Sequence, residues 1–224
     1  LAGAGIVTVI LDINEEAAQK VATTVQEETG TKSFGMKANV LDKASLVAVL
    51  QQITDEEGQI DFLINGAGGN SPQATTQLEE LTEDDLDSLE KSFFGLEMEG
   101  FQKVFDLNFM GTLLPSMVFA KQMVQRQKGV ILNISSMNAY KPLTKIPAYS
   151  AAKASINNFT EWLAVHFAKT GVRVNAIAPG FFLTNQNRFL LVDEATGALT
   201  SRGKKIITST PMGTFGEPAD ITGT

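Results

Sequence analysis

Apolar residues along the chain follow two alternating patterns. Short runs rich in β-branched residues predict buried strands, and each is followed by a longer segment with apolar residues at helical spacing. The predicted strands cover residues 5–12, 32–40, 60–65, 129–136 and 172–180. The predicted helices cover residues 14–30, 42–58, 100–127 and 148–171. The acidic segment 71–100 indicates loop with short helix, and the third helix is expected to be disturbed near Asn108 or Pro115.

Strands that alternate with helices of this length predict parallel βαβ units, and therefore an α/β fold with a Rossmann-type, doubly wound sheet. No linker, charge block or low-complexity tract divides the chain, so residues 1–224 are predicted to form a single domain. Ligands of such sheets bind beyond the carboxyl ends of the strands. Polar or glycine-rich residues stand at four of these ends: Asp12, 65–69, 135–138 and 178–182. Their common position is the first indication of a functional site.

Composition and charge exclude several classes of function. The net charge of −7 disfavours a nucleic-acid surface, which requires clustered Lys and Arg. There are no cysteines, and the single His166 cannot form a histidine cluster, so no metal site is predicted. No apolar run reaches the roughly 18 residues that span a bilayer, and no signal peptide is evident. The default is a cytoplasmic protein with no membrane partner.

Tyr149 and Lys153 lie four residues apart in the small-residue run "PAYSAAKAS", and therefore share one face of the predicted helix. An ammonium beside a phenol favours the phenolate. We therefore expect Lys153 to lower the pKa of Tyr149 and allow proton transfer at neutral pH. A simple surface pair is the alternative. Ser135 and Ser136 end the preceding strand, where their hydroxyls can hydrogen-bond a substrate oxygen or merely form a turn.

Asp12 ends the first predicted strand. An acid at this point can accept hydrogen bonds from the adenosine ribose of a dinucleotide and would repel the 2′-phosphate of NADP, which favours NAD. It could equally cap the next helix. The glycines of residues 65–69 allow a backbone to approach a ligand closely, although an ordinary tight turn is the simpler interpretation.

Taken together, these segments resemble the short-chain dehydrogenase/reductase family over nearly the whole chain. "YSAAK" matches its Y-x-x-x-K signature, and Ser136 stands thirteen residues before Tyr149, the family spacing. "DLNFMGT" matches the segment that holds the family's asparagine, here Asn108. "NGAG" is similar to N-N-A-G, with Gly66 in place of the second asparagine. "ANV" parallels an Asp-Val at the adenine, and "APGFFLT" fits P-G-x-x-x-T.

The resemblance implies a role for each of these residues. Tyr149 would be the acid/base that exchanges a proton with the substrate oxygen during hydride transfer, while Lys153 would tune it and bind the nicotinamide ribose. Ser136 would orient the substrate, Asn108 would hold a water, and Tyr140 would line the pocket. The cofactor, NAD rather than NADP, would contact Asp12, Asn39, Val40, Asn65, Gly66, Ala67, Gly68, Tyr149, Lys153, Pro179, Gly180 and Thr184.

The family's glycine-rich pyrophosphate loop is not found in the chain, which begins at Leu1. The resemblance implies that this loop lies upstream, after a strand placed between those that end at Asp12 and Asn65. A last strand is also expected beyond the other end. We therefore expect the chain to be a piece of a longer one that lacks the first βα unit and does not fold stably alone.

Within the family, residues 135–159, 163–191 and 210–218 are similar to the branch that interconverts D-mannonate and D-fructuronate. A sugar acid needs a cation for its carboxylate and partners for its hydroxyls. The candidates are Lys141, Lys145 and Arg188 for the charge and Asn138, Asn185, Gln186 and Asn187 for the hydroxyls. Solvated lysines and an unbound Arg188 are the alternative.

Other substrates and another class of function stay open. The small-molecule substrate could instead be a neutral sugar, a polyol or an acyl thioester, and a non-catalytic NAD-binding scaffold is the alternative of a different class. The resemblance also implies a homotetramer or homodimer, paired through the helices that hold Asn108 and Tyr149.

Overall fold

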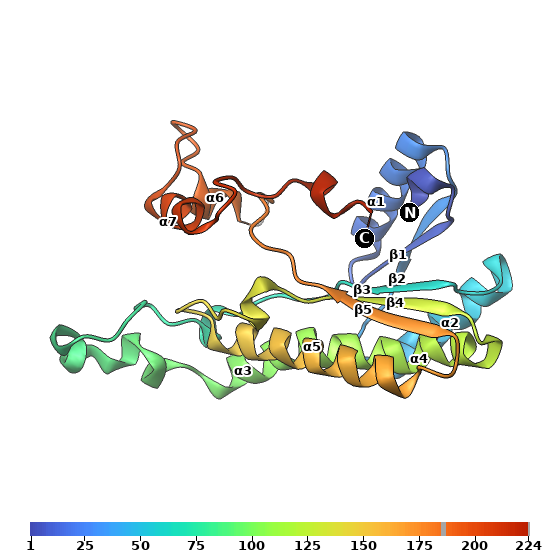
Figure 1. Cartoon of the computed structure of the whole chain (residues 1–224), viewed down its shortest axis with the longest axis horizontal. Coiled ribbons are helices and arrows are strands. Elements are labelled where there is room, and N and C mark those ends of the chain that lie inside the picture. Colours follow the sequence, from blue (N-terminus) through green and yellow to red (C-terminus); the bar gives the residue numbers. More distant parts are fainter. Residues whose placement is uncertain (185–186, 224) are drawn as a thin grey trace.

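The strands form two parallel sheets (Figure 1). The computed structural model describes residues 1–184 and 187–223. The strands found in them are β1 (Thr8–Asp12), β2 (Ser33–Lys37), β3 (Phe62–Asn65), β4 (Gly129–Ile134) and β5 (Val172–Ile177). β1 pairs with β2, and β4 lies between β3 and β5, with every pairing parallel. The predicted α/β fold with a parallel, Rossmann-type sheet is confirmed.

Helices connect these strands as predicted. The connecting helices are α1 (Glu15–Thr29), α2 (Lys43–Glu57) and α5 (Pro147–His166). The side chains of Asn14 and Asp42 cap α1 and α2 by accepting hydrogen bonds from backbone amides of the first turn. Gly30 ends α1 with a left-handed φ of 69°, which suits a residue without a Cβ.

The predicted helix 100–127 is divided into three parts. α3 (Met98–Phe105) leads into a single π-helical turn, Asp106–Met110, and α4 (Gly111–Arg126) follows. The disturbance therefore lies at Asn108, whereas Pro115 is accommodated inside α4. A π turn inserts an extra residue into a helix and is often found at functional sites.

Helices cover both faces of the first sheet. Neighbouring residues of a strand point to opposite faces. Gly35 of β2 faces α1, since a Cβ here would lie 2.3 Å from the backbone carbonyl carbon of Ala18. The next residue, Met36, belongs to the buried cluster that includes Leu46 and Ile53 of α2. This doubly wound arrangement agrees with the prediction.

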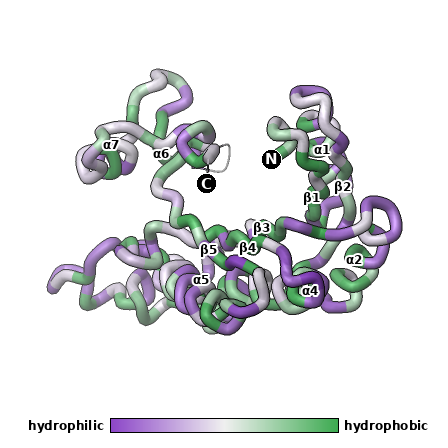
Figure 2. Tube along the Cα trace, turned by 45° about the vertical axis from the view of Figure 1, so that its right-hand side comes forward, coloured by the Kyte–Doolittle hydropathy of each residue, from purple (hydrophilic) through white to green (hydrophobic). Residues whose placement is uncertain are grey.

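In the described part of the chain, helices pack against one face of the second sheet only. Ala120 and Met123 of α4 pack with Ile131 of β4, Leu163 of α5 and Val174 of β5 in one buried cluster. The β1–β2–α1 unit and a lobe formed by α6 (Arg188–Leu191) and α7 (Ser201–Ser209) rise on the opposite side, at two ends of the molecule (Figure 2). No helix in the described part of the chain is long and apolar enough to cross a membrane.

The strands β1 and β3 leave edges and apolar side chains exposed to solvent. β1 and β3 each have one strand partner among the described residues, and Phe62 and Ile64 of β3 are 43% and 48% exposed. The solvent-accessible surface is 13689 Å², whereas a compact chain of this length exposes about 10,000 Å². The expectation that an additional strand is needed for stability stays a prediction.

Gly35 should be required for the packing of α1 on the first sheet. Substitution Gly35→Ala would force the α1 backbone away, and we expect a loss of about 1–3 kcal/mol of unfolding free energy. Gly3→Ala is the matched control, because a Cβ at Gly3 has no neighbour within 4 Å. Because we do not expect this piece to fold stably alone, the measurement is the urea unfolding midpoint of the full-length protein, and equal midpoints for the two variants would contradict the packing described here.

Candidate active site

The carboxyl ends of the second sheet's strands bring the predicted site segments together. The amide of Ser135, after β4, donates to the carbonyl of Ile177 at the end of β5 at 2.8 Å. The amide of Met137 donates to the carbonyl of Pro179 at 3.1 Å. After β3, Gly69 exchanges hydrogen bonds with the side chain of Asn108. Three strand ends and the π turn therefore meet at one place.

Lys153 lies inside this cluster with almost no exposure to solvent. It is 4% exposed, and its Nζ donates a hydrogen bond of 2.8 Å to the carbonyl of Ile134, the last residue of β4. Burial lowers the pKa of Lys153 to about 8, because a charged ammonium loses its hydration there. None of the ion pairs found in the described residues involves this side chain. The alternative of a simple surface pair between Tyr149 and Lys153 is therefore wrong.

Tyr149 lies beside Lys153 as its spacing predicts. The Nζ of Lys153 is 5.6 Å from the centre of the Tyr149 ring. Burial raises the pKa of the Tyr149 phenol, and a hydrogen bond with the Ser136 side chain lowers it by a smaller amount. The expectation that Lys153 sets a lowered pKa is therefore wrong for this geometry, in which desolvation of the phenolate outweighs its neighbours. Ser136 and Tyr149 do meet, as predicted.

Asn108 fastens the glycine loop to the π turn. Its Nδ2 donates to the carbonyls of Gly69 at 2.7 Å and Val104 at 2.8 Å, and its Oδ1 accepts from the amide of Gly69 at 3.3 Å. The side chain is completely buried. Both Nδ2 hydrogens are thus used within the protein, which leaves Oδ1 as the atom available to a further donor.

Gly68 is needed for close approach rather than for turn geometry. A Cβ at this position would lie 2.6 Å from Oδ1 of Asn108 and 3.2 Å from Nζ of Lys153. The φ angle of Gly68 is not among the positive ones, so any residue could adopt its backbone conformation. Close packing against two candidate catalytic side chains therefore explains this glycine, and the tight-turn interpretation does not.

Asn65 is directed away from the expected cofactor position. Its Nδ2 donates to Ser116 Oγ at 3.0 Å and to Asn133 Oδ1 at 2.8 Å, inside the core between the sheet and its helices. Both amide hydrogens are committed there and are not available to a cofactor, and the prediction that Asn65 contacts a cofactor stays a prediction. Ser116 and Asn133 were not predicted from the sequence. The polar Asn133 at an inward position of the apolar strand β4 was a signal that could have indicated a buried polar contact.

Asp12 is free for a ligand because another residue caps α1. The Oδ1 atom of Asn14 accepts from the amide of Ala17, while the carboxylate of Asp12 accepts, among the described residues, only from the amide of Asn14, at 2.8 Å. The carboxylate therefore keeps acceptor capacity toward solvent. Farther along, the Oδ1 atom of Asn39 accepts from the amide of Leu41 at 3.0 Å, which fixes the turn after β2.

Backbone space near the strand ends suits a flat ligand. A Cβ at Gly180 would meet nothing within 4 Å, and one at Gly66 would meet only the side chain of Ile134, at 3.9 Å. Val40 packs toward α4, where its Cγ2 would be 3.1 Å from a Cβ at Gly111. Together with the Asp12 carboxylate and the Lys153 ammonium, these residues fit a dinucleotide. Ala67 is half-buried in the same loop.

The predicted substrate residues lie in different surroundings. Asn187 accepts from the amide of Thr184 and donates to the carbonyl of Phe182, each at 2.8 Å, so its side chain stabilises its own loop, and a substrate contact for it stays a prediction. Asn138 is buried, with an Oδ1 that has no partner. Arg188 begins α6 and is exposed. Asn185 and Gln186 lie outside the described residues.

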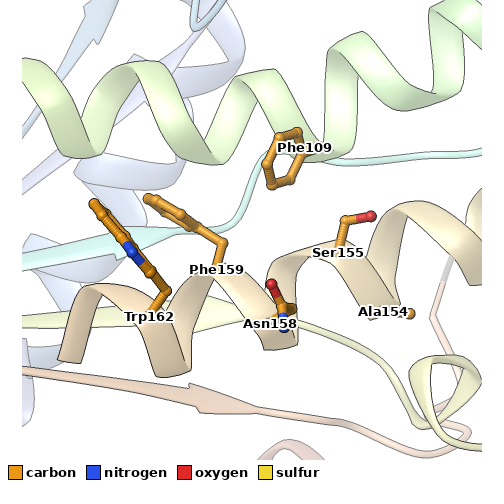
Figure 3. Close-up of a pocket in the computed structure, with 6 residues that line it drawn as sticks. All are labelled: Phe109, Ala154, Ser155, Asn158, Phe159 and Trp162. Carbon is orange, nitrogen blue, oxygen red and sulfur yellow. The ribbon is translucent and has the colours of Figure 1, made fainter. Parts of the chain in front are cut away.

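A hollow lies on the outer surface of the helices, away from these residues (Figure 3). Its volume is about 500 Å³, and its walls are Phe109, Ala154, Ser155, Asn158, Phe159 and Trp162. Phe109 of the π turn meets Phe159 of α5 edge to face, with ring centres 6.0 Å apart. The hollow has no charged side chain in its walls. It offers surface for packing rather than groups for catalysis.

Comparisons with known proteins agree with this geometry. An oxidoreductase of Haemophilus influenzae with no assigned substrate is 52% identical over 214 residues, covering 96% of this chain and 74% of its own. The oxidoreductase UxuB of Bacillus subtilis, likewise uncharacterized, is 50% identical over 224 residues, covering 100% and 79%.

A solved structure is also similar. It is a presumed D-mannonate oxidoreductase from Haemophilus influenza with bound NAD, with a TM-score of 0.86 and 53% identity, covering 93% of this chain and 74% of its own. The family model for the short-chain dehydrogenases matches residues 1–194. This chain therefore belongs to the short-chain dehydrogenase family of oxidoreductases.

Proposed function

We propose that the chain interconverts a sugar-acid alcohol and its ketone, D-mannonate and D-fructuronate, with NAD as the hydride carrier. The observation that carries the chemistry is the convergence of Ser136, Tyr149 and Lys153 at the carboxyl end of β4. The substrate and the choice of NAD rest on similarity to the presumed D-mannonate oxidoreductase with bound NAD, which is 53% identical.

Tyr149 is the group that moves the proton. When bound, the nicotinamide cofactor would supply the hydride chemistry, with the oxidised form as acceptor and the reduced form as donor. In the reducing direction, the phenol of Tyr149 gives its proton to the carbonyl oxygen, which becomes the product hydroxyl. In the oxidising direction, the phenolate takes the proton from the substrate hydroxyl. The Ser136 hydroxyl, which already hydrogen-bonds Tyr149, holds the same substrate oxygen in place.

The raised pKa of Tyr149 favours reduction near neutral pH. Burial keeps the phenol protonated, and therefore ready to donate, well into the alkaline range. Oxidation instead needs the phenolate, whose charge the buried Lys153 ammonium can balance. With its pKa of about 8, Lys153 carries that charge on most molecules below pH 8. The two directions should therefore differ in their pH dependence.

Asp12 supports NAD over NADP. Its exposed carboxylate keeps acceptor capacity that the ribose hydroxyls can use, whereas a 2′-phosphate would meet a negative charge. Arg188 supports a substrate with a carboxylate. It stands at the start of α6 on the lobe that follows β5, and it belongs to none of the ion pairs among the described residues.

A substrate panel tests the proposed function. We expect NAD-dependent oxidation of D-mannonate, followed by NADH absorbance, with little turnover of mannitol or glucose and at least 10-fold lower efficiency with NADP. Preference for a neutral polyol or an acyl thioester would identify a different dehydrogenase, and absence of turnover on the whole panel would favour a scaffold.

Arg188→Ala should raise KM for the sugar acid far more than for any neutral substrate, because only the acid loses a counter-charge.

Tyr149→Phe should lower kcat by about 10²–10⁴-fold, since the variant has no proton to transfer. Tyr140→Phe is the control, because it removes the other tyrosine of the chain, which is 72% exposed. Activity that survives in Tyr149→Phe would remove this residue from the mechanism.

In the parent enzyme, the rate of oxidation should increase as the pH rises toward the raised pKa of Tyr149, while the rate of reduction should stay constant into the alkaline range.

We also propose that two copies pair through the outer face of α5. Trp162 is 57% and Val165 78% exposed on the carboxyl half of this helix, while Ala154, Ser155 and Asn158 on the other half are small. A two-fold axis that pairs the helices antiparallel would place the large side chains of each copy against the small ones of the other. The exposed surface of 13689 Å² leaves room for such an interface.

Trp162→Glu should prevent this pairing. The variant is expected to elute as a monomer under conditions where the parent chain is a dimer or tetramer, as measured by size-exclusion chromatography with light scattering. Phe93→Glu is the matched control, since Phe93 is 66% exposed but lies on the separate segment before α3. If Trp162→Glu kept the parent mass, the interface would lie elsewhere.

A further inference from the structure

A row of buried polar side chains crosses the core beneath the active site. Its members come from β3, β4, α4 and α5, and each is at most 7% exposed. They are Thr112, Ser116, Asn65, Asn133 and Thr160. Such groups are costly to bury unless each is hydrogen-bonded. The proton transfer described above uses none of their side chains.

The hydrogen bonds of the row have one defined direction. Ser116 donates to the carbonyl of Thr112 at 2.7 Å, so its oxygen accepts from Asn65 at 3.0 Å. Asn65 donates its second hydrogen to Asn133, at 2.8 Å, and Asn133 donates to Thr160 Oγ1 at 2.9 Å. Each hydroxyl has one hydrogen and each is already committed. The row therefore cannot reorient without leaving a buried donor unpaired.

One end of the row reaches a candidate active-site residue, and the other end lies one helical turn from another. At one end, Thr112 Oγ1 donates to the carbonyl of Asn108 in the π turn at 2.9 Å. At the other end, Thr160 Oγ1 donates at 2.7 Å to the carbonyl of Ile156, one helical turn beyond Lys153. In the middle, Asn133 precedes Ile134, whose carbonyl accepts from Lys153 Nζ.

The row does not carry protons. Three of its hydrogen bonds are donated by the side-chain amides of Asn65 and Asn133, which keep their hydrogens at any pH where the protein is folded. Its effect is geometric, because it connects the helix that holds Asn108 to the helix that holds Tyr149 and Lys153. An apolar core of the same shape would allow one helix to shift against the other at little cost.

We propose that Asn133 and Thr160 are positioning residues for the hydride-transfer reaction, which set α5 against β4 and so hold Tyr149 and Lys153 in register with Asn108. This inference rests on the proposed dehydrogenase function. A displacement of about 1 Å in a reacting group can cost on the order of 100-fold in rate. Loss of one hydrogen bond from the row should therefore change turnover as well as stability.

Thr160→Val tests the proposal, because valine keeps the shape and removes the hydroxyl. We expect kcat to fall about 10-fold, with KM for NAD changed by less than about 2-fold, and Thr160→Ser to restore the parent kcat. Thr54→Val is the matched control. Thr54 likewise donates to a carbonyl of its own helix, Leu50, and accepts from Gln122 of α4, but outside the row. It should lower Tm and leave kcat unchanged.

A second measurement needs no substrate. Phenolate absorbance titrates Tyr149 directly, with Tyr149→Phe as the blank for Tyr140. In Thr160→Val the Tyr149 transition should move toward the ordinary tyrosine value, because a loosened α5 buries the phenol less. An unchanged titration, or a kcat loss no larger than that of Thr54→Val, would overturn the positioning role. Absence of turnover in the parent would overturn the proposed function instead, and the titration would still decide this proposal.

Discussion

The arrangement of this site depends on one buried charge. The ammonium of Lys153 is 4% exposed and its pKa falls to about 8, so the fold spends stability to hold it there. A carbonyl has to face it, and β4 supplies that carbonyl where the strand ends, at Ile134. The loop after β3 approaches Lys153 closely at Gly68, where a Cβ would lie 3.2 Å from Nζ, so a residue without a side chain is needed there. An amide oxygen from the π turn completes the surroundings of the charge.

The buried charge also explains why Tyr149 behaves differently from a tyrosine beside a solvated lysine. The environment that lowers the pKa of Lys153 raises that of Tyr149, because both charged forms lose hydration in the same place. Each group therefore disfavours its own charge, while the pair would favour the two charges together. Below pH 8 the pair therefore rests as neutral phenol with ammonium, the state that can donate a proton to a substrate oxygen.

Much of the fold was predictable from the sequence because it depends on local periodicity. The strand expected at 129–136 is β4, Gly129–Ile134, and the pairing of Tyr149 with Lys153 follows from helical spacing alone. The tertiary contacts that individual side chains make were not predictable. Asn65 ends a strand just as a ligand-binding residue would, yet its side chain points to the helices. Asn187 was assigned to the substrate by composition, whereas its hydrogen bonds serve its own loop.

Strand register explains how one sheet can serve both a core and a site. Leu63 of β3, Ile131 of β4 and Val174 of β5 are paired across the sheet and form an apolar layer. Two residues closer to the carboxyl ends, the inward positions become Asn65, Asn133 and Ala176, again in register.

The change from apolar to polar thus occurs in a single step along β3 and β4, directly beneath the proposed catalytic residues. The small Ala176 beside Asn133 leaves room for the amide to turn toward Thr160 of α5. A shift of one residue in any pairing would send these side chains to the opposite face. The same register that closes the hydrophobic core therefore determines where the polar row, and with it the active site, can form.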